Sequence, residues 1–183
     1  RDRISTVERV TKEYPIAILN EIRAAMGHIS DCYYLKNREL IKINCDKAQG
    51  HLRRGLLDCL KYLWYHYDVE IENLIKQFKY ADFTIIHDGE FNKELNKRIK
   101  ESKLAFKFAQ NSENLGSNQN NNEVYDKYKD AVLKAKDVID YFIDEIPYIQ
   151  HLNRKTLKMK VVGFLGWAVA LVVTIFFGIM SIL

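Results

Sequence analysis

Two glycine–histidine pairs have the residue types and spacing that most clearly offer chemistry. Gly27–His28 and Gly50–His51 lie in the near-repeated segments AMGHI and AQGHL. If the chain turns near Arg38, antiparallel helices bring the two pairs face to face, and the glycines let the helices approach closely. Together with nearby basic side chains, the imidazoles are suited to bind the phosphate of a nucleotide or oligonucleotide. The predicted ligand-binding residues are Arg23, His28, Lys47, His51, Arg53 and Arg54, with Lys42 and Lys61 extending the site.

Two other interpretations of these residues stay open. The first is structural: hydrogen-bonded core histidines at a close helix contact. The second is catalytic, because Arg23 and His28 have an Arg-x4-His spacing that resembles the motif of HEPN ribonucleases. In that family the motif lies in a helical bundle, usually in a dimer, and cleaves RNA without a metal ion. Here Ala24 takes the place of the polar residue that usually follows the arginine. A HEPN-like bundle that binds a ligand without catalysis is therefore favoured over an enzyme.

The rest of the composition argues against several common chemistries. The net charge of +4 permits an anionic ligand or a membrane lipid but requires neither. Cys32, Cys45 and Cys59 form no CxxC pair and match no histidine at metal-ligand spacing, so we expect reduced, largely buried thiols. The sequence contains no P-loop, Gly-rich dinucleotide loop or HExxH motif. We therefore expect neither a metal ion nor a cofactor.

The elements that must position these residues are helices throughout. Proline and glycine number only 2 and 8 in 183 residues, and long segments without either favour helices. The apolar spacing predicts an antiparallel all-α bundle. Its expected helices cover 5–14, 16–33, 46–80, 90–110 and 123–160, with a turn near 37–39 or 44, a loop at 82–89 and a flexible, polar loop at 111–122. Pro147 is expected to kink or break the last helix.

Helical spacing also predicts which faces are buried. The last helix of the bundle carries a regular apolar face. Its members are Val124, Tyr128, Ala131, Ala135, Val138, Phe142 and Ile146. Trp64 and its aromatic neighbours in 46–80 are expected to pack in the core rather than form a platform on which a ligand stacks.

The segment 161–183 is predicted to be a transmembrane helix. It has 23 residues and no charge, and at 1.5 Å per residue it would cover about 34 Å, enough for a bilayer core of about 30 Å. Arg154, Lys155, Lys158 and Lys160 precede it. Because basic flanks stay in the cytoplasm, 1–160 is expected to be a cytoplasmic domain of a single-pass inner-membrane protein that contacts membrane lipid.

Small residues in 161–183 recur at steps of three and four. They are Gly163, Gly166, Ala170, Thr174, Gly178 and Ser181. On a helix they share one face, where small side chains let neighbouring helices approach. This face predicts a homo-oligomer, either a tight bundle or a ring around a pore; a plain anchor is the alternative.

The chain as a whole resembles the membrane effectors of bacterial anti-phage systems, in particular those of the Hailong type. The resemblance rests on NEIRAAMGHISDCYY (20–34), CDKAQGHLRRGLLDCLKYLWY (45–65) and the order of helical bundle, basic segment and apolar C-terminal helix. It implies a partner nucleotidyltransferase that makes a single-stranded DNA oligomer; the effector binds the oligomer and stays closed, and loss of the oligomer opens an ion channel.

Together these features predict an oligomeric membrane effector of anti-phage defence. It would be an ion channel or a membrane-disrupting protein, gated by a nucleotide or oligonucleotide that binds the helical domain. Two alternatives remain: a membrane-tethered HEPN-type ribonuclease and a non-catalytic membrane scaffold.

Overall fold

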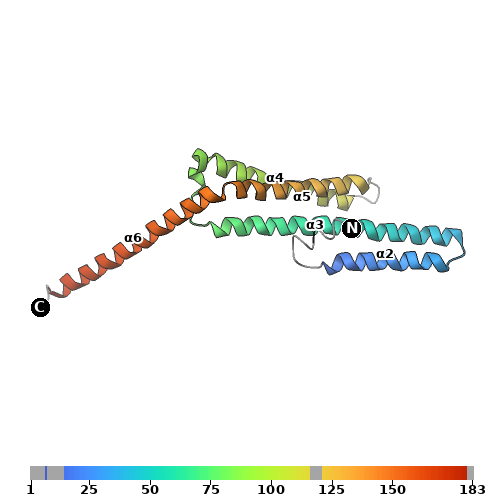
Figure 1. The fold of residues 1–183 in the computed structure, drawn as a ribbon, viewed down its shortest axis with the longest axis horizontal. Coiled ribbons are helices and arrows are strands. Elements are labelled where there is room, and N and C mark those ends of the chain that lie inside the picture. Colours follow the sequence, from blue (N-terminus) through green and yellow to red (C-terminus); the bar gives the residue numbers. More distant parts are fainter. Residues whose placement is uncertain (1–6, 8–14, 116–120, 181–183) are drawn as a thin grey trace. The chain divides into compact units, whose positions relative to one another are not determined.

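The regular elements of the chain are helices. The computed structural model describes residues 7, 15–115 and 121–180, of which 115, 121 and 168–180 are described by their backbone alone. The helices are α2 (Ile16–Tyr34), α3 (Arg38–Gln77), the short 3-10 helix η1 (Phe83–Gly89), α4 (Glu90–Leu115), α5 (Asn121–Asp144) and α6 (Ile146–Met180) (Figure 1). The all-α prediction is confirmed for these residues. The helix expected over 5–14 lies, apart from Val7, outside the described residues.

The turn that pairs α2 with α3 lies near one of the two predicted places. Asn37 accepts hydrogen bonds through Oδ1 from the backbone N–H of Glu39, at 2.8 Å, and of Leu40, at 3.4 Å. It thereby satisfies amides that have no partner within the first turn of α3. The helix expected from residue 46 therefore begins at Arg38, and α2 and α3 form a hairpin.

The flexible loop predicted at 111–122 is wrong at both ends, because α4 continues to Leu115 and α5 begins at Asn121, and 116–120 lie outside the described residues. Glu113 accepts hydrogen bonds from Nζ of Lys61, at 2.7 Å, and from the hydroxyl of Tyr128, at 2.5 Å. These partners lie on α3 and α5. Tertiary contacts thus stabilise a helical turn whose polar local sequence predicted a flexible loop.

The predicted break near Pro147 is confirmed. α5 ends at Asp144, Glu145 forms a turn, and α6 begins at Ile146. Proline lacks a backbone N–H and is tolerated in the first turn of a helix, where that N–H would have no intrahelical acceptor. Pro147 therefore starts the new helix rather than kinking a continuous one.

The prediction of a transmembrane helix over 161–183 is corrected. Among the residues that the structure describes, no helix combines the length and the apolar character needed to cross a membrane.

The chain divides into two compact units. Unit 1 comprises Arg1–Ile71 and Lys97–Ile139, and unit 2 comprises Glu72–Asn96 and Asp140–Leu183. The core of unit 1 lies where α3, α4 and α5 meet: Trp64 stacks on Phe106 with ring centroids 3.9 Å apart, and Tyr128 meets Phe106 edge to face. All the residues predicted for the apolar face of 123–146 are buried except Ile146, which is half-buried. The expected core position is confirmed for Trp64, whereas its aromatic neighbour Tyr65 is exposed.

Unit 2 has an aromatic core of its own. The rings of Phe78, Phe83, Phe91 and Phe142 contact one another with centroids about 6 Å apart. The loop expected at 82–89 begins with a short 3-10 turn, which Asp82 caps through a hydrogen bond from the backbone N–H of Thr84. From Ile86 to Gly89 its backbone is not helical, and His87, Asp88 and Gly89 have positive φ angles.

Candidate functional site

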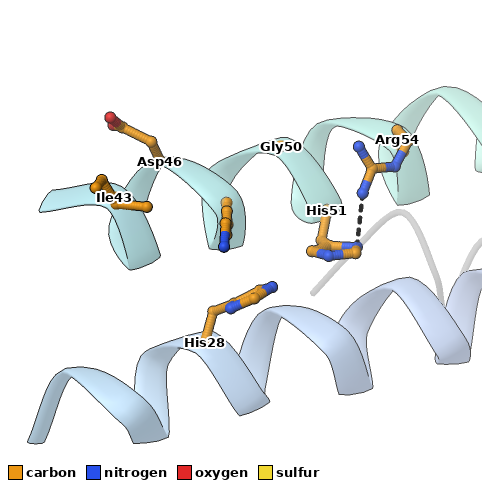
Figure 2. Close-up of a pocket in the computed structure, with 7 residues that line it drawn as sticks. His28, Ile43, Asp46, Gly50, His51 and Arg54 are labelled. Carbon is orange, nitrogen blue, oxygen red and sulfur yellow. Dashed lines mark hydrogen bonds between the residues drawn. The ribbon is translucent and has the colours of Figure 1, made fainter. Parts of the chain in front are cut away.

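The two predicted histidines face each other across the α2–α3 hairpin, in which the helices lie side by side and antiparallel (Figure 1). The rings of His28 and His51 stack with their centroids 5.3 Å apart and their planes 25° apart. Figure 2 shows them pointing toward each other from α2 and α3. Beside them is an open cavity of about 650 Å³. Its lining residues are His28, Ile43, Asp46, Lys47, Gly50, His51 and Arg54.

The ring of His28 is oriented by Asn44 on the facing helix. Nδ1 of His28 lies 3.0 Å from Oδ1 of Asn44, and Nδ2 of Asn44 donates to the backbone carbonyl of Leu40. The second bond fixes which end of the amide faces the imidazole, so Oδ1 accepts and Nδ1 of His28 donates. One side chain of α3 thus sets both the direction and the protonated nitrogen of His28.

His51 has two partners at a single nitrogen. Nδ1 of His51 lies 2.8 Å from Oε2 of Glu21 and 2.7 Å from Nη2 of Arg54. The same carboxylate oxygen accepts from Nε of Arg54 at 3.1 Å. Because the guanidinium only donates, Nδ1 can accept from Arg54 or donate to Glu21, but cannot do both in one protonation state.

The polar contacts of this cluster stabilise the charged form of Glu21. The hydrogen bond from His51 has the largest effect, and the hydrogen bond and positive charge of Arg54 add to it. They lower the pKa of Glu21 below its ordinary value against the opposing effect of burial. Glu21 is therefore a carboxylate at neutral pH and holds the two cationic or protonatable groups of α3 against α2.

The structure brings together four of the six predicted ligand-binding residues. His28, Lys47, His51 and Arg54 line the cavity. Arg23 and Arg53 are exposed and are not among its lining residues. Lys42 is also exposed, whereas Lys61 bonds to Glu113 in the core region of unit 1 and does not extend the site.

The prediction that Gly27 and Gly50 bring the helices close is wrong. A Cβ atom at Gly27 would meet nothing within 4 Å, and one at Gly50 would meet only a terminal nitrogen of Arg54, at 3.7 Å. The close approach lies at Gly55, where an added Cβ would be 3.3 Å from Cβ of Glu21. Antiparallel packing places Gly55, rather than either glycine of the repeats, against the backbone of α2.

Two of the three cysteines are less buried than expected. Cys59 is buried beside Ile18 and Leu63, but Cys32 is half-buried and Cys45 is exposed. In the part of the chain that the structure describes, no three histidine, cysteine or acidic side chains gather in a way that could hold a metal ion.

Of the predicted association face in 161–183, side chains are described only as far as 167. Gly163 and Gly166 lie on α6 and are exposed, and added Cβ atoms there would meet nothing within 4 Å. The side chains of Ala170, Thr174, Gly178 and Ser181 lie outside the described residues. The predicted homo-oligomer stays a prediction.

The sequence reasoning missed Glu21, Asn44, Asp46 and Ile43. Glu21 lies 30 positions from His51 along the chain, and Asn44 lies 16 positions from His28. No motif joins residues at these separations. A signal was nevertheless present: once the turn is placed at 35–37, an antiparallel register that pairs His28 with His51 also brings Glu21 and Asn44 into the site.

Scanning the chain against models of protein families gives no match, and searches of curated proteins and of solved structures give none either. The functional argument therefore rests on the chemistry of the α2–α3 hairpin.

Proposed function

We propose that the α2–α3 hairpin is a ligand-binding module for the phosphate of a nucleotide or an oligonucleotide. The observation that carries the proposal is the cavity at the stacked His28–His51 pair, which Lys47 and Arg54 also line. Its volume of about 650 Å³ falls within the range of small-molecule sites. Guanidinium, ammonium and imidazole N–H groups all donate hydrogen bonds and suit the oxygens of a phosphate.

The arrangement of charges supports an anionic ligand. Among the described residues that line the cavity, Asp46 contributes the one carboxylate, and it points away from the two rings (Figure 2). Glu21 holds Arg54 through Nε and leaves the terminal nitrogens of the guanidinium directed elsewhere. Nη2 of Arg54 now bonds to His51. A phosphate oxygen can replace His51 as the acceptor, which frees Nδ1 of His51 to donate to Glu21 and resolves the conflict at that nitrogen.

The stacking of the rings indicates which part of a nucleotide the site contacts. A base binds a protein most readily by stacking on an aromatic or imidazole face. The 5.3 Å between the ring centroids of His28 and His51 leaves no room for another ring between them. The proposed contacts are therefore with phosphate rather than with the bases, so affinity is expected to depend on salt more than on base sequence.

The geometry favours this binding role over RNA cleavage by Arg23 and His28. The side chain of Arg23 is exposed and does not line the cavity that contains His28. Nδ1 of His28 is engaged with Asn44 in a bond that fixes the ring. The ribonuclease stays a prediction without support from this site, and its test is RNA integrity with the natural chain and with His28→Ala.

The decisive binding experiment compares two adjacent arginines of α3. Binding of inorganic phosphate, ATP and a short single-stranded DNA to the full chain is measured by calorimetry and, for DNA with a fluorescent label, by anisotropy. Arg54→Gln removes a cavity residue and is expected to weaken binding about 10- to 100-fold, the usual value of a charge-assisted hydrogen bond. Arg53→Gln makes the same change of charge at an exposed position outside the lining and is expected to change affinity less than about twofold.

Two outcomes would contradict the proposal. If Arg53→Gln and Arg54→Gln weaken binding equally, the attraction comes from the overall charge of the hairpin rather than from the cavity. If none of the three probes binds, the cavity is not a phosphate site. The relative affinities for phosphate, ATP and DNA distinguish a site for a single phosphate from one that follows a longer chain.

The wider role, a ligand-gated effector of anti-phage defence with a nucleotidyltransferase partner, stays a prediction. Its test is the membrane potential of cells that express the full chain or a version ending at Lys160. Depolarisation by the full chain alone would support that role, and unchanged potential together with intact RNA would favour the scaffold alternative.

A further inference from the structure

Two thiols lie in contact near the tip of the α2–α3 hairpin. Sγ of Cys32 on α2 is 3.7 Å from Sγ of Cys45 on α3. The thiol of Cys32 also lies 3.2 Å from the backbone carbonyl of His28 and 3.7 Å from that of Ile41. The sequence separation of the two cysteines, 13 positions, matches no redox motif, and the pair exists because of the antiparallel packing.

We propose that Cys32 and Cys45 form a reversible intramolecular disulfide, which makes the tip of the hairpin an oxidation site of this protein. The inference is independent of the proposed phosphate binding. It depends on the proximity of the two sulfur atoms and on the exposure of Cys45 to solvent.

The geometry makes the bond accessible without unfolding. A disulfide needs its sulfur atoms about 2.05 Å apart, so the pair has to close by less than two ångströms from 3.7 Å. Both cysteines are near the ends of their helices that meet at the turn over 35–37, where a small movement of one helix costs few core contacts. Rotation about the Cα–Cβ bonds supplies the rest of the approach.

Exposure sets the order of the two chemical steps. Cys45 is exposed, whereas Cys32 is half-buried. Burial, together with the hydrogen bond to Cys45, raises the pKa of the Cys32 thiol. An oxidant in solution therefore reacts first at Cys45, and Cys32 acts as the resolving thiol.

The oxidant required is a low-molecular-weight disulfide, written R–S–S–R. The Cys45 thiolate attacks one of its sulfur atoms, and the S–S bond breaks to release R–S⁻ and leave a mixed disulfide on Cys45. The Cys32 thiolate then attacks Sγ of Cys45 and releases the second R–S⁻. The two protons of the protein thiols pass to solvent or to the released thiolates. The protein loses two electrons, and R–S–S–R gains them.

The bond would tie α2 to α3 next to the residues that orient His28. Cys32 bonds to the carbonyl of His28, and Cys45 directly follows Asn44, whose side chain accepts from the His28 ring. Oxidation closes a ring of the chain from 32 to 45 and restricts the unfolded state. The oxidised protein is therefore expected to melt at a higher temperature than the reduced protein.

The test uses the full natural chain with oxidised glutathione as the probe. After acid quenching, unreacted thiols are alkylated and the digested protein is analysed by mass spectrometry. The expected result is a peptide pair linked through Cys32 and Cys45, with the chain lighter by two hydrogen atoms and Cys59 still alkylated. A reductant should restore alkylation at both sites and remove the gain in melting temperature.

Cys32→Ser provides the control for the mechanism. Without the resolving thiol, glutathione is expected to accumulate as a stable mixed disulfide on Cys45, and the melting temperature should not rise. The proposal is overturned if the natural chain also accumulates that mixed disulfide, if the bridge joins two chains, or if Cys59 reacts as readily as Cys45.

Discussion

Gly55 on α3 lies directly against Glu21 on α2, since a Cβ atom added to Gly55 would lie 3.3 Å from Cβ of Glu21. Gly55 is buried, and its added Cβ would also lie 3.9 Å from the backbone carbonyl of Ile18. The carboxylate of Glu21 can reach His51 and Arg54 because the helices are this close. The absence of a side chain at Gly55 therefore allows the hydrogen bonds of Glu21 to form one turn away.

This contact predicts that substitutions at Gly27 and Gly55 affect stability differently. Gly27→Ala adds a methyl group in open space and should stabilise the fold by about 0.5–1 kcal/mol, the cost of glycine in a helix. Gly55→Ala should lose that gain because its Cβ presses on Glu21, and Gly55→Leu should destabilise by about 1–3 kcal/mol through overpacking. Urea unfolding of the three variants measures the difference. Equal stabilisation by both alanines would show that the helices separate freely.

A second prediction concerns the buried hydrogen bond between α3 and α4. Nε1 of Trp64 donates to the hydroxyl of Ser102 at 3.1 Å, and both residues are buried. Ser102→Ala leaves the indole N–H without this acceptor and should cost about 1–3 kcal/mol. Ser30→Ala makes the same change at an exposed position of α2 and should change stability by less than about 0.5 kcal/mol. The urea midpoints of the two variants test the difference, provided that their unfolding free energies depend equally steeply on urea concentration.

The lowered pKa of Glu21 predicts how acid affects stability. Its pKa in the folded chain lies below the ordinary value of 4.5, first because of the hydrogen bond from His51. A carboxyl group of this kind adds stability that is fully present above its unfolded pKa and is lost as the pH falls through its folded pKa. The free energy of unfolding should therefore fall as the pH drops below 4.5. Glu21→Gln should flatten part of that fall, and an unchanged slope would show that the cluster does not stabilise the charged carboxylate.

The last turn of α4 is predicted to depend on Glu113. Burial raises the pKa of Glu113, but hydrogen bonds from Lys61 and Tyr128 outweigh burial and lower it, so the charged carboxylate receives both bonds. Glu113→Ala removes them and should speed backbone hydrogen exchange over 111–115 by about tenfold, equivalent to about 1.4 kcal/mol. Asn114→Ala, at an exposed neighbouring position, should leave exchange unchanged or slow it. Equal exchange in both variants would mean that local helix propensity alone maintains this turn.

The sequence by itself determined that the described segments are helical and which face of α5 is buried. The spacing from Val124 to Phe142 predicted a face that is buried throughout, because 3.6-residue periodicity is a local property that any packed helix must satisfy. It also predicted the break near Pro147, which follows from a missing N–H. The meeting of His28 with His51 was predicted as well, because it requires two antiparallel helices with the turn near Arg38.

Only the tertiary structure decided which residues complete the site at His28 and His51 and where helices such as α4 end. In the structure Arg54 rather than Arg53 lines the cavity, and Gly55 rather than Gly27 packs against the facing helix. Cys32 lies against Cys45. Each of these choices depends on the rotation and register of one helix against another, and a shift of one residue turns a side chain by about 100° around the helix. The extension of α4 through Glu113 likewise came from partners on α3 and α5, whose contacts outweigh the local preference of a polar segment for a loop.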